Sequence, residues 1–225
     1  ILIYSFFLVG ILLRLNMSRK LFSFLFLYIC SIFKSKKIIN RNLDIFSKKI
    51  SSQNRKKIIN NMWKNYGKTF IEYIFLDYFR KNNSHTVIIG EENLSQIIKK
   101  NKQVIFISGH FANFELMSME ITKKNINLAT IYRPLNNFFL NPFMEYLRKK
   151  YVCKNQIKKG IKGVKETIEH IKKKNCIALM IDQRVSEGES IDFFKNPALT
   201  TTLPAQLSIK FDIDIVLVYI VRHND

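Results

Sequence analysis

The chain has 225 residues, of which 47% are hydrophobic and 24% charged, so it is long enough for one domain with a sizeable core and is not disordered. Its net charge of +20 favours an anionic partner such as nucleic acid, an anionic membrane face or an acidic protein, although genomic base bias also produces Lys-rich chains. Three scattered cysteines without a C-x-x-C pair argue against a disulfide framework or a structural zinc site and fit a reduced, cytosol-facing chain.

Two apolar runs, residues 1–13 and 21–33, flank a basic segment at the start of the chain. Each run is too short to cross about 30 Å of hydrocarbon, which takes roughly 20 residues. Arg14 and Lys20 between them would be costly at the bilayer centre. Three membrane arrangements fit: a helical hairpin in one leaflet, a spanning second run helped by its flanks, or a first run that is the tail of a longer span. A buried core hairpin is the alternative without a membrane.

The basic tract at 34–41 suits an anionic cytoplasmic leaflet, which favours the membrane interpretation. We therefore expect residues 1–35 to form an apolar helical membrane-anchor segment and residues 36–225 to form one α/β domain. The chain starts with Ile and stops directly after a strand-like run, so we expect it to be a fragment that lacks the C-terminal part of this domain.

Residues 38–81 carry apolar side chains at helical spacing, and their aromatic stripe is either core or the lining of an acyl or membrane surface. From residue 85 onward short apolar runs alternate with helical patterns. The expected strands are 85–90, 103–108, 126–133, 176–182 and 213–221, and the expected helices are 91–102, 113–125, 136–151, 160–175 and 203–212. This alternation predicts an α/β fold with a mixed, mostly parallel sheet flanked by helices, in which ligands bind at the carboxyl ends of the strands.

The stretch ISGHFANFELMS places His110 at the carboxyl end of an expected strand and Glu115 in the first turn of the next helix. A carboxylate that accepts from one imidazole nitrogen raises the basicity of the other, which can then take a proton from a hydroxyl group. The nearby helix N-terminus suits an oxyanion or a phosphate, and Gly109 permits a tight turn. Alone, H-x-x-x-x-E is a weak signal, since a loop His and a surface Glu produce it as well.

Other polar groups follow expected strands. Arg133 ends one strand and Arg148 lies in the following helix, where guanidinium groups suit a phosphate or a developing oxyanion. Asp182 and Gln183 end another strand; the carboxylate there could pair with an arginine, hold a hydroxyl group, or simply cap a turn. Asn113 is either a helix N-cap or a site residue. The P-loop, G-x-G-x-x-G, G-x-S-x-G and H-E-x-x-H motifs are absent from the sequence, and we expect neither a metal nor a cofactor.

Four stretches in this order resemble the sequence blocks of the bacterial lipid A late acyltransferases, the Kdo-lipid A lauroyl/myristoyl transferase family, over roughly residues 40–225. They are GHFANFE, IYRPLNN with Arg148 in the next helix, IDQ, and IDFFKNPALTTTLPAQLS, in which a loop is expected after Phe194. The family usually has Gly where this chain has Lys195. The resemblance implies a membrane-bound O-acyltransferase of the glycerolipid-acyltransferase superfamily, which transfers a fatty acyl chain from an acyl-carrier-protein thioester to a hydroxyl of a lipid A precursor.

By this resemblance His110 is the general base and Glu115 orients it. The expected substrate-binding residues are Arg133, Arg148, Asp182, Gln183 and Asn113. The resemblance also implies a bacterial inner-membrane location with the catalytic domain on the cytoplasmic face. The acidic carrier protein, the phosphorylated glycolipid and an anionic membrane surface all suit the basic chain, and no nucleic-acid partner is expected. Two alternatives stay open: another lipid acceptor, such as a lysophospholipid or a glycosylated phospholipid, and a non-catalytic basic protein that binds membranes or nucleic acid.

Overall fold

The computed structural model describes residues 2–33, 35–186 and 188–223. Two compact units divide the chain: a helical unit of residues 1–75 and 190–198, and a sheet unit of residues 76–189 and 199–225. The boundary expected at residue 35 stays a prediction. In the structure, the helices that follow residue 35 and end at residue 72 group with the apolar N-terminus.

Helix α1 (Leu2–Tyr28) of the helical unit folds back on itself at Arg14, where the backbone leaves the helical region with φ 59° and ψ 173°. The rings of Phe6 and Phe22 on either side of this point lie 5.8 Å apart in a T-shaped contact. A straight helix would separate those two residues by about 24 Å along its axis, because each residue adds 1.5 Å. The two apolar runs therefore form a helical hairpin, a feature that the one-leaflet arrangement and the buried core arrangement share.

This hairpin changes the expectation of a membrane-spanning anchor. Ser18 Oγ donates a hydrogen bond to the carbonyl oxygen of Gly10 at 2.6 Å and ties the two arms together near the reversal. In the part of the chain that the structure describes, no helix has both the length and the hydropathy to cross a membrane. The reversal at Arg14 is the physical reason, because each arm is shorter than the roughly 20 residues that a span requires. A transmembrane helix is therefore not supported there.

Helix α3 (Ser52–Glu72) packs along the α1 hairpin. The ring of Phe70 lies 5.9 Å from that of Phe22, and a Cβ atom added at Gly67 would lie only 2.2 Å from the carbonyl oxygen of Phe22. Glycine at this position lets the two helix backbones approach closely. Helix α2 (Lys36–Phe46) and two short 3₁₀ segments, Cys30–Phe33 and Tyr73–Phe75, complete the helical part of this unit.

A two-stranded hairpin, β5 (Glu189–Phe193) and β6 (Asn196–Thr200), stands where the sequence predicts a loop after Phe194. Phe194 and Lys195 form its turn, and both have a positive φ, 49° and 60°. The ring of Phe194 contacts that of Phe46 in α2, with 5.2 Å between their centroids. The alternation of side chains in this exposed segment is too irregular to predict strands, and the turn requires a backbone conformation that Phe and Lys rarely adopt.

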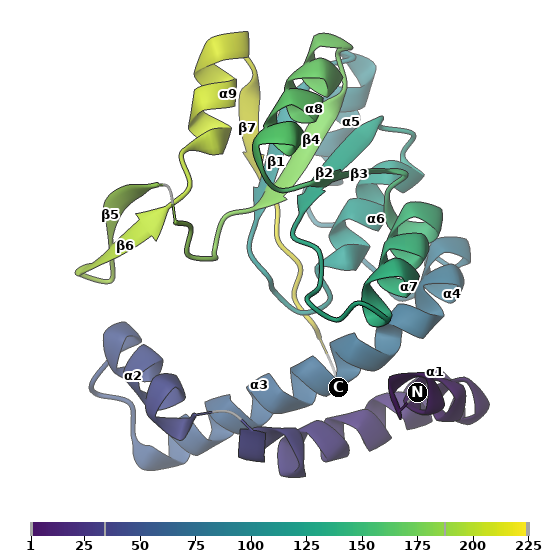
Figure 1. Ribbon diagram of the computed structural model, residues 1–225. Coiled ribbons are helices and arrows are strands. Elements are labelled where there is room, and N and C mark those ends of the chain that lie inside the picture. Colours follow the sequence, from purple (N-terminus) through teal and green to yellow (C-terminus); the bar gives the residue numbers. More distant parts are fainter. Residues whose placement is uncertain (1, 34, 187, 224–225) are drawn as a thin grey trace. The chain divides into compact units, whose positions relative to one another are not determined.

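The sheet unit confirms the predicted α/β fold (Figure 1). Its strands are β1 (Val104–Ser108), β2 (Leu128–Tyr132), β3 (Asn155–Lys158), β4 (Cys176–Met180) and β7 (Asp214–Leu217), in the order β3-β2-β4-β1-β7. All neighbours in this sheet pair in parallel. The helices are α4 (Leu76–Lys81), α5 (Glu91–Lys99), α6 (Glu115–Lys123), α7 (Leu140–Leu147), α8 (Ile161–Lys172) and α9 (Leu203–Phe211), and a π-helical turn (Arg148–Val152) follows α7.

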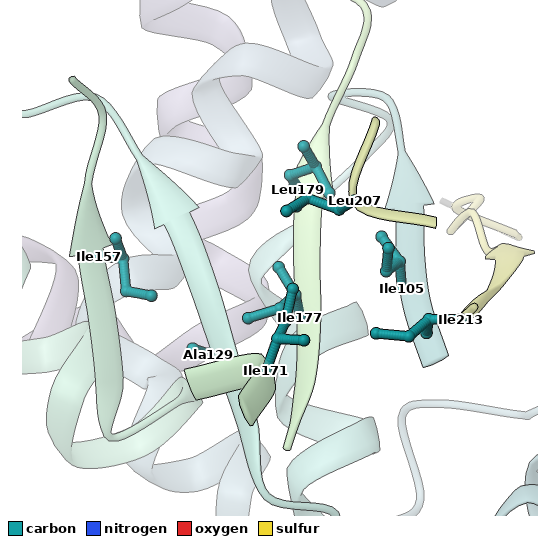
Figure 2. Close-up of a cluster of buried hydrophobic side chains, with 8 residues drawn as sticks. All are labelled: Ile105, Ala129, Ile157, Ile171, Ile177, Leu179, Leu207 and Ile213. Carbon is teal, nitrogen blue, oxygen red and sulfur yellow. The ribbon is translucent and has the colours of Figure 1, made fainter. Parts of the chain in front are cut away.

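The core of the sheet unit lies between the sheet and the helices α8 and α9 (Figure 2). Ile105, Ile177 and Ala129 on three adjacent strands are fully buried and meet Ile171 of α8 and Leu207 of α9. Since successive strand residues point to opposite faces, Phe106 points to the other side, where it is 1% exposed. Both faces of the sheet are therefore covered, which explains why its central strands are continuous apolar runs.

Two predicted details of the sheet are wrong. Residues 85–90, expected as a strand, form turns and irregular backbone, and Val87 and Ile89 are 90% and 91% exposed. The β-branched composition resembles a strand, but no strand of the described sheet lies beside it to pair with. Conversely, β3 was missed, because Asn155–Lys158 is a polar edge strand with one buried side chain, Ile157.

Candidate active site

The side chains of His110 and Asp182 meet at the carboxyl ends of β1 and β4. These strands pair in parallel with Ser108 opposite Met180, so the residues two positions further along leave the sheet side by side. His110 Nδ1 lies 2.7 Å from Asp182 Oδ1, and the backbone N–H of His110 donates to Asp182 Oδ2 at 2.7 Å. One carboxylate thus fixes both the ring and the backbone of the histidine. The His110 side chain is 32% exposed, so a substrate can reach it.

This pairing determines which nitrogen of His110 is available for chemistry. An ionised carboxylate can only accept hydrogen bonds, so Nδ1 carries the proton and Nε2 presents its lone pair. The sequence assigned the orienting carboxylate to Glu115, whereas the carboxylate on Nδ1 in the structure is that of Asp182. The role predicted for Glu115 as the orienting group stays a prediction.

The turn that holds His110 depends on small residues. A Cβ atom at Gly109 would lie 2.9 Å from a carbon of the Phe111 ring and 3.2 Å from Asp182 Oδ2, so glycine makes room for these two side chains rather than supplying a positive φ. Ala112 in the same turn has a φ of 43°, in the left-handed region. The Phe114 ring contacts the imidazole edge to face at 4.6 Å. The ring of His110 is therefore restrained on one side by a carboxylate and on another by an aromatic ring.

Glu115 and Arg148 form a second pair, and both are largely buried. Arg148 Nε donates to Glu115 Oε1 at 2.7 Å, and Arg148 Nη2 lies 2.7 Å from the same oxygen; the side chains are 11% and 7% exposed. Glu115 is the first residue of α6, where the helix dipole stabilises a negative charge. The guanidinium carbon of Arg148 lies 5.8 Å from the centroid of the Tyr132 ring, within the range of a cation–π contact.

Tyr132 continues this polar network along the edge of the sheet. Burial, and after it the neighbouring Glu145 carboxylate, raises the pKa of Tyr132, so its hydroxyl stays protonated. Burial alone would raise the pKa of Glu145, but interactions with Tyr132, Asn141 and Lys158 lower it overall. Asn141 Nδ2 donates to Glu145 at 2.8 Å, and Lys158 Nζ lies 3.4 Å away. The carboxylate of Glu145 therefore stays charged and holds the end of β3 against α7.

The other predicted site residues lie along the same edge. Arg133 directly follows β2 and Gln183 follows β4, and both are exposed. Asn113 is 2% exposed in the turn before α6; the N-cap of that helix is Phe114, so Asn113 does not occupy the capping position. The structure thus brings together His110 with Asp182, while Arg133 and Gln183 extend from neighbouring strand ends.

Tyr132 and Glu145 were not predicted as parts of the site. Tyr132 lies within the IYRPLNN stretch, so its position beside Arg133 was a usable signal, whereas nothing in the sequence near Glu145 distinguishes it from a surface residue. Among the described residues, no group of three or more His, Cys, Asp and Glu side chains could hold a metal ion. What the arrangement offers chemically is an oriented imidazole base with a buried, charge-paired guanidinium on the same sheet edge.

Comparison with known proteins adds an independent observation. The model of one protein family, described as bacterial lipid A biosynthesis acyltransferase, matches residues 2–225 and so covers nearly the whole chain. The match includes the turn with His110, the Glu115–Arg148 pair and the strand end with Asp182. A search of curated protein sequences found no match.

Proposed function

The chain belongs to the bacterial lipid A biosynthesis acyltransferase family, and from this premise we propose that it transfers a fatty acyl chain from an acyl-carrier-protein thioester to a hydroxyl of a lipid A precursor. The observation that supports a catalytic role most directly is the contact between His110 Nδ1 and Asp182 Oδ1 at 2.7 Å. It makes Nε2 of His110 a base at the sheet edge where α/β folds bind ligands.

In the proposed reaction, His110 Nε2 takes the proton of the acceptor hydroxyl as its oxygen attacks the thioester carbonyl. Asp182 stabilises the imidazolium that forms. The tetrahedral intermediate then collapses: the carbon–sulfur bond breaks, an ester bond remains, and the proton passes from His110 to the departing thiolate of the carrier protein. A thioester is already activated, so the reaction needs no covalent intermediate on the enzyme. General-base assistance of this kind contributes roughly 10²–10⁴-fold to the rate.

For Arg148 we propose electrostatic stabilisation of the substrate. A buried guanidinium suits either a phosphate of the glycolipid or the developing oxyanion, because its donors have a fixed planar geometry. Glu115 then acts through Arg148, since it accepts from the guanidinium at 2.7 Å and neutralises it in the absence of substrate. Arg133, exposed at the end of the neighbouring strand, is the second cation proposed for the phosphorylated acceptor.

We also propose that the protein works at the cytoplasmic face of the bacterial inner membrane. The α1 hairpin supports this location, because it exposes the large apolar side chains of Leu8, Ile11, Leu12 and Met17 around its reversal. A short helical hairpin with exposed apolar side chains suits binding within the interface of one leaflet. Exposed Lys36 and Lys37 begin the next α-helix, α2, and suit an anionic surface.

The proposal is tested in a bacterial strain from which a lipid A late acyltransferase gene has been deleted. The gene for this protein should restore the mass of one fatty acyl chain to lipid A, as measured by mass spectrometry. The His110→Ala variant, expressed at the same level in the membrane fraction, should leave the acyl count unchanged from the deletion strain. An unchanged acyl count with the wild-type protein, together with a new acylated phospholipid, would replace lipid A by another lipid acceptor.

A further inference from the structure

One surface of the sheet unit combines exposed aromatic rings with cations. We call it the docking rim, and its residues are Phe138, Phe139, Ile161, Arg133, Lys159 and Lys162. Phe138, Phe139 and Ile161 are 83%, 77% and 83% exposed. Isolated apolar residues on a surface are common, whereas two adjacent phenylalanines and an isoleucine with this exposure form an apolar patch on one side of a site.

The sheet register places the two parts of this rim at one edge. Strands β2 and β3 are parallel neighbours with Tyr132 opposite Lys158, and the backbone N–H of Lys159 donates to the carbonyl oxygen of Tyr132 at 2.8 Å. Arg133 and Lys159 therefore leave the sheet side by side. The loop with the two phenylalanines continues from Arg133, and Ile161 begins α8 directly after Lys159 and Gly160.

The loop that carries the phenylalanines has a defined conformation. Asn137 Oδ1 accepts hydrogen bonds from the backbone N–H groups of Phe139 and Leu140, both at 3.0 Å. The rings of Phe138 and Phe139 contact each other edge to face at 5.8 Å. Asn137 thus holds the start of α7 and presents both rings outward, so their exposure belongs to an ordered turn.

The charges near the rings indicate what covers them. Arg133, Lys159 and Lys162 are all exposed. Among the carboxylates on the adjoining elements, Glu145 of α7 is already engaged by Lys158 and Asn141, and exposed Glu166 follows Lys162 by one turn of α8, so the rim keeps an excess of positive charge. An anionic bilayer matches both features, since phenylalanine gains free energy at the boundary of headgroups and acyl chains and lysine gains it near anionic headgroups. An acidic protein would satisfy the cations but would need an apolar pocket for two rings as well.

We propose that the docking rim binds the surface of an anionic bilayer, with Phe138 and Phe139 inserted and Arg133, Lys159 and Lys162 at the headgroups. The rim occupies the carboxyl ends of β2 and β3, and the next strand in the sheet, β4, leads to Asp182. A lipid acceptor therefore reaches His110 from the membrane plane without leaving the bilayer. This inference rests on the proposed function in one respect, namely that the acceptor is a lipid.

The first test compares acyl transfer to a lipid A precursor held in vesicles of phosphatidylethanolamine and phosphatidylglycerol with transfer to the same precursor in detergent micelles. The double variant Phe138→Ser/Phe139→Ser should lose about tenfold in rate on vesicles and keep the wild-type rate in micelles. The matched control is Val87→Ser/Ile89→Ser, which removes two equally exposed apolar side chains elsewhere in the sheet unit and should keep both rates. Equal rates for the rim variant and the wild type on vesicles would overturn the inference.

A second readout does not depend on activity. In a Trp63→Phe background, Phe139→Trp should shift its fluorescence to shorter wavelength and be quenched by brominated lipids on anionic vesicles, whereas Val87→Trp should not. An absence of quenching at position 139 would overturn the inference even if the enzyme is active. If the wild-type protein transfers no acyl chain in either assay while position 139 is quenched, the proposed function fails and the docking rim stands. A raised KM for the carrier protein in micelles would assign the rim to that protein instead.

Discussion

At the scale of single residues, the division of labour between Asp182 and Glu115 is the point on which the mechanism depends. Asp182 contacts His110 Nδ1 and Glu115 contacts Arg148, each at 2.7 Å. The sequence spacing suggested Glu115 as the group that orients His110, which stays a prediction, whereas Asp182 is the carboxylate on Nδ1 in the structure. Residues five positions apart across a strand-to-helix turn need not face each other. The parallel register of β1 and β4, which is not visible in a single sequence, brings His110 and Asp182 together.

Substitution of Asp182 by Asn distinguishes these roles. The amide can present an N–H group to Nδ1 and favour the tautomer with the proton on Nε2, which is the wrong one for a general base. We expect kcat to fall roughly 10²–10⁴-fold with little change in KM for the acceptor. The measurement is steady-state acyl transfer with the acceptor concentration varied.

Glu115→Gln is the matched comparison for this experiment. It leaves the His110–Asp182 contact intact and weakens the ion pair that positions Arg148. We therefore expect a higher KM for the phosphorylated acceptor and a smaller loss of kcat than with Asp182→Asn. If Glu115→Gln lowers kcat as strongly as His110→Ala while Asp182→Asn does not, Glu115 orients the base and the assignment made from the geometry is reversed.

Cys153 carries a pH-dependent contribution to stability. Burial raises the pKa of its thiol to about 11 from an ordinary value of 9.0. Between these values the unfolded chain releases the proton and the folded chain keeps it, so the free energy of unfolding falls as the pH rises. From about pH 8 to about pH 10.5 the wild type should lose roughly 2 kcal/mol more than Cys153→Ala, as measured by urea unfolding. Equal losses of unfolding free energy in the two proteins would show that burial does not raise the pKa of the Cys153 thiol.

At the scale of secondary-structure elements, the turn of the β5–β6 hairpin places Lys195 in a backbone conformation that favours glycine, the residue that the resemblance leads us to expect there. Lys195 has a φ of 60°, a conformation that is costly for residues with a Cβ atom and free for glycine. Lys195→Gly should therefore raise the free energy of unfolding by roughly 1 kcal/mol, and Lys195→Ala, which removes the charge but keeps Cβ, should not. Thermal unfolding of the three proteins is the measurement, and a gain with Ala equal to that with Gly would assign the effect to charge.

The contact between α1 and α3 depends on Gly67. At Lys195 a change to glycine should stabilise the fold, whereas at Gly67 a change away from glycine should destabilise it. Replacing an exposed helical glycine by alanine usually stabilises a helix by roughly 1 kcal/mol. At Gly67 the added Cβ would lie 2.2 Å from the carbonyl oxygen of Phe22, which is backbone and cannot rotate away. Gly67→Ala should therefore destabilise the helical unit by roughly 1–3 kcal/mol, whereas Asn61→Ala on the exposed side of α3 should not. Urea unfolding followed by Trp63 fluorescence is the measurement, and unchanged stability of Gly67→Ala would contradict the close approach.

The elements also show what a single sequence can and cannot predict. The central strands were predictable because they are buried on both faces and read as unbroken apolar runs, as in Val104–Ser108 and Cys176–Met180. The edge strand β3 was not, because only Ile157 of its side chains is buried. The residues of the site were predictable from their places at strand ends, whereas their pairing depends on strand order and register, which only the fold supplies.

At the scale of the whole molecule, the structure shows where several of the cations behind the net charge of +20 lie. Arg148 is buried beside Glu115, Arg133 and Lys159 lie on the docking rim, and Lys36 follows the α1 hairpin. The proposed substrates, an acidic carrier protein and a phosphorylated glycolipid, are both anionic. The positive charge of the protein would therefore attract both of them. The family match extends over residues 2–225 and therefore covers both the helical unit and the sheet unit.

The central claim is acyl transfer with His110 as the base, and one measurement tests it most directly. Membranes containing the protein are incubated with an acyl-carrier-protein thioester and a lipid A precursor, and the initial rate of ester formation is followed by mass spectrometry. The wild type should add one acyl chain to the precursor, and His110→Ala, folded and present at the same level, should be slower by at least about 10²-fold. Ester formation at the wild-type rate by His110→Ala would contradict the assignment of the base.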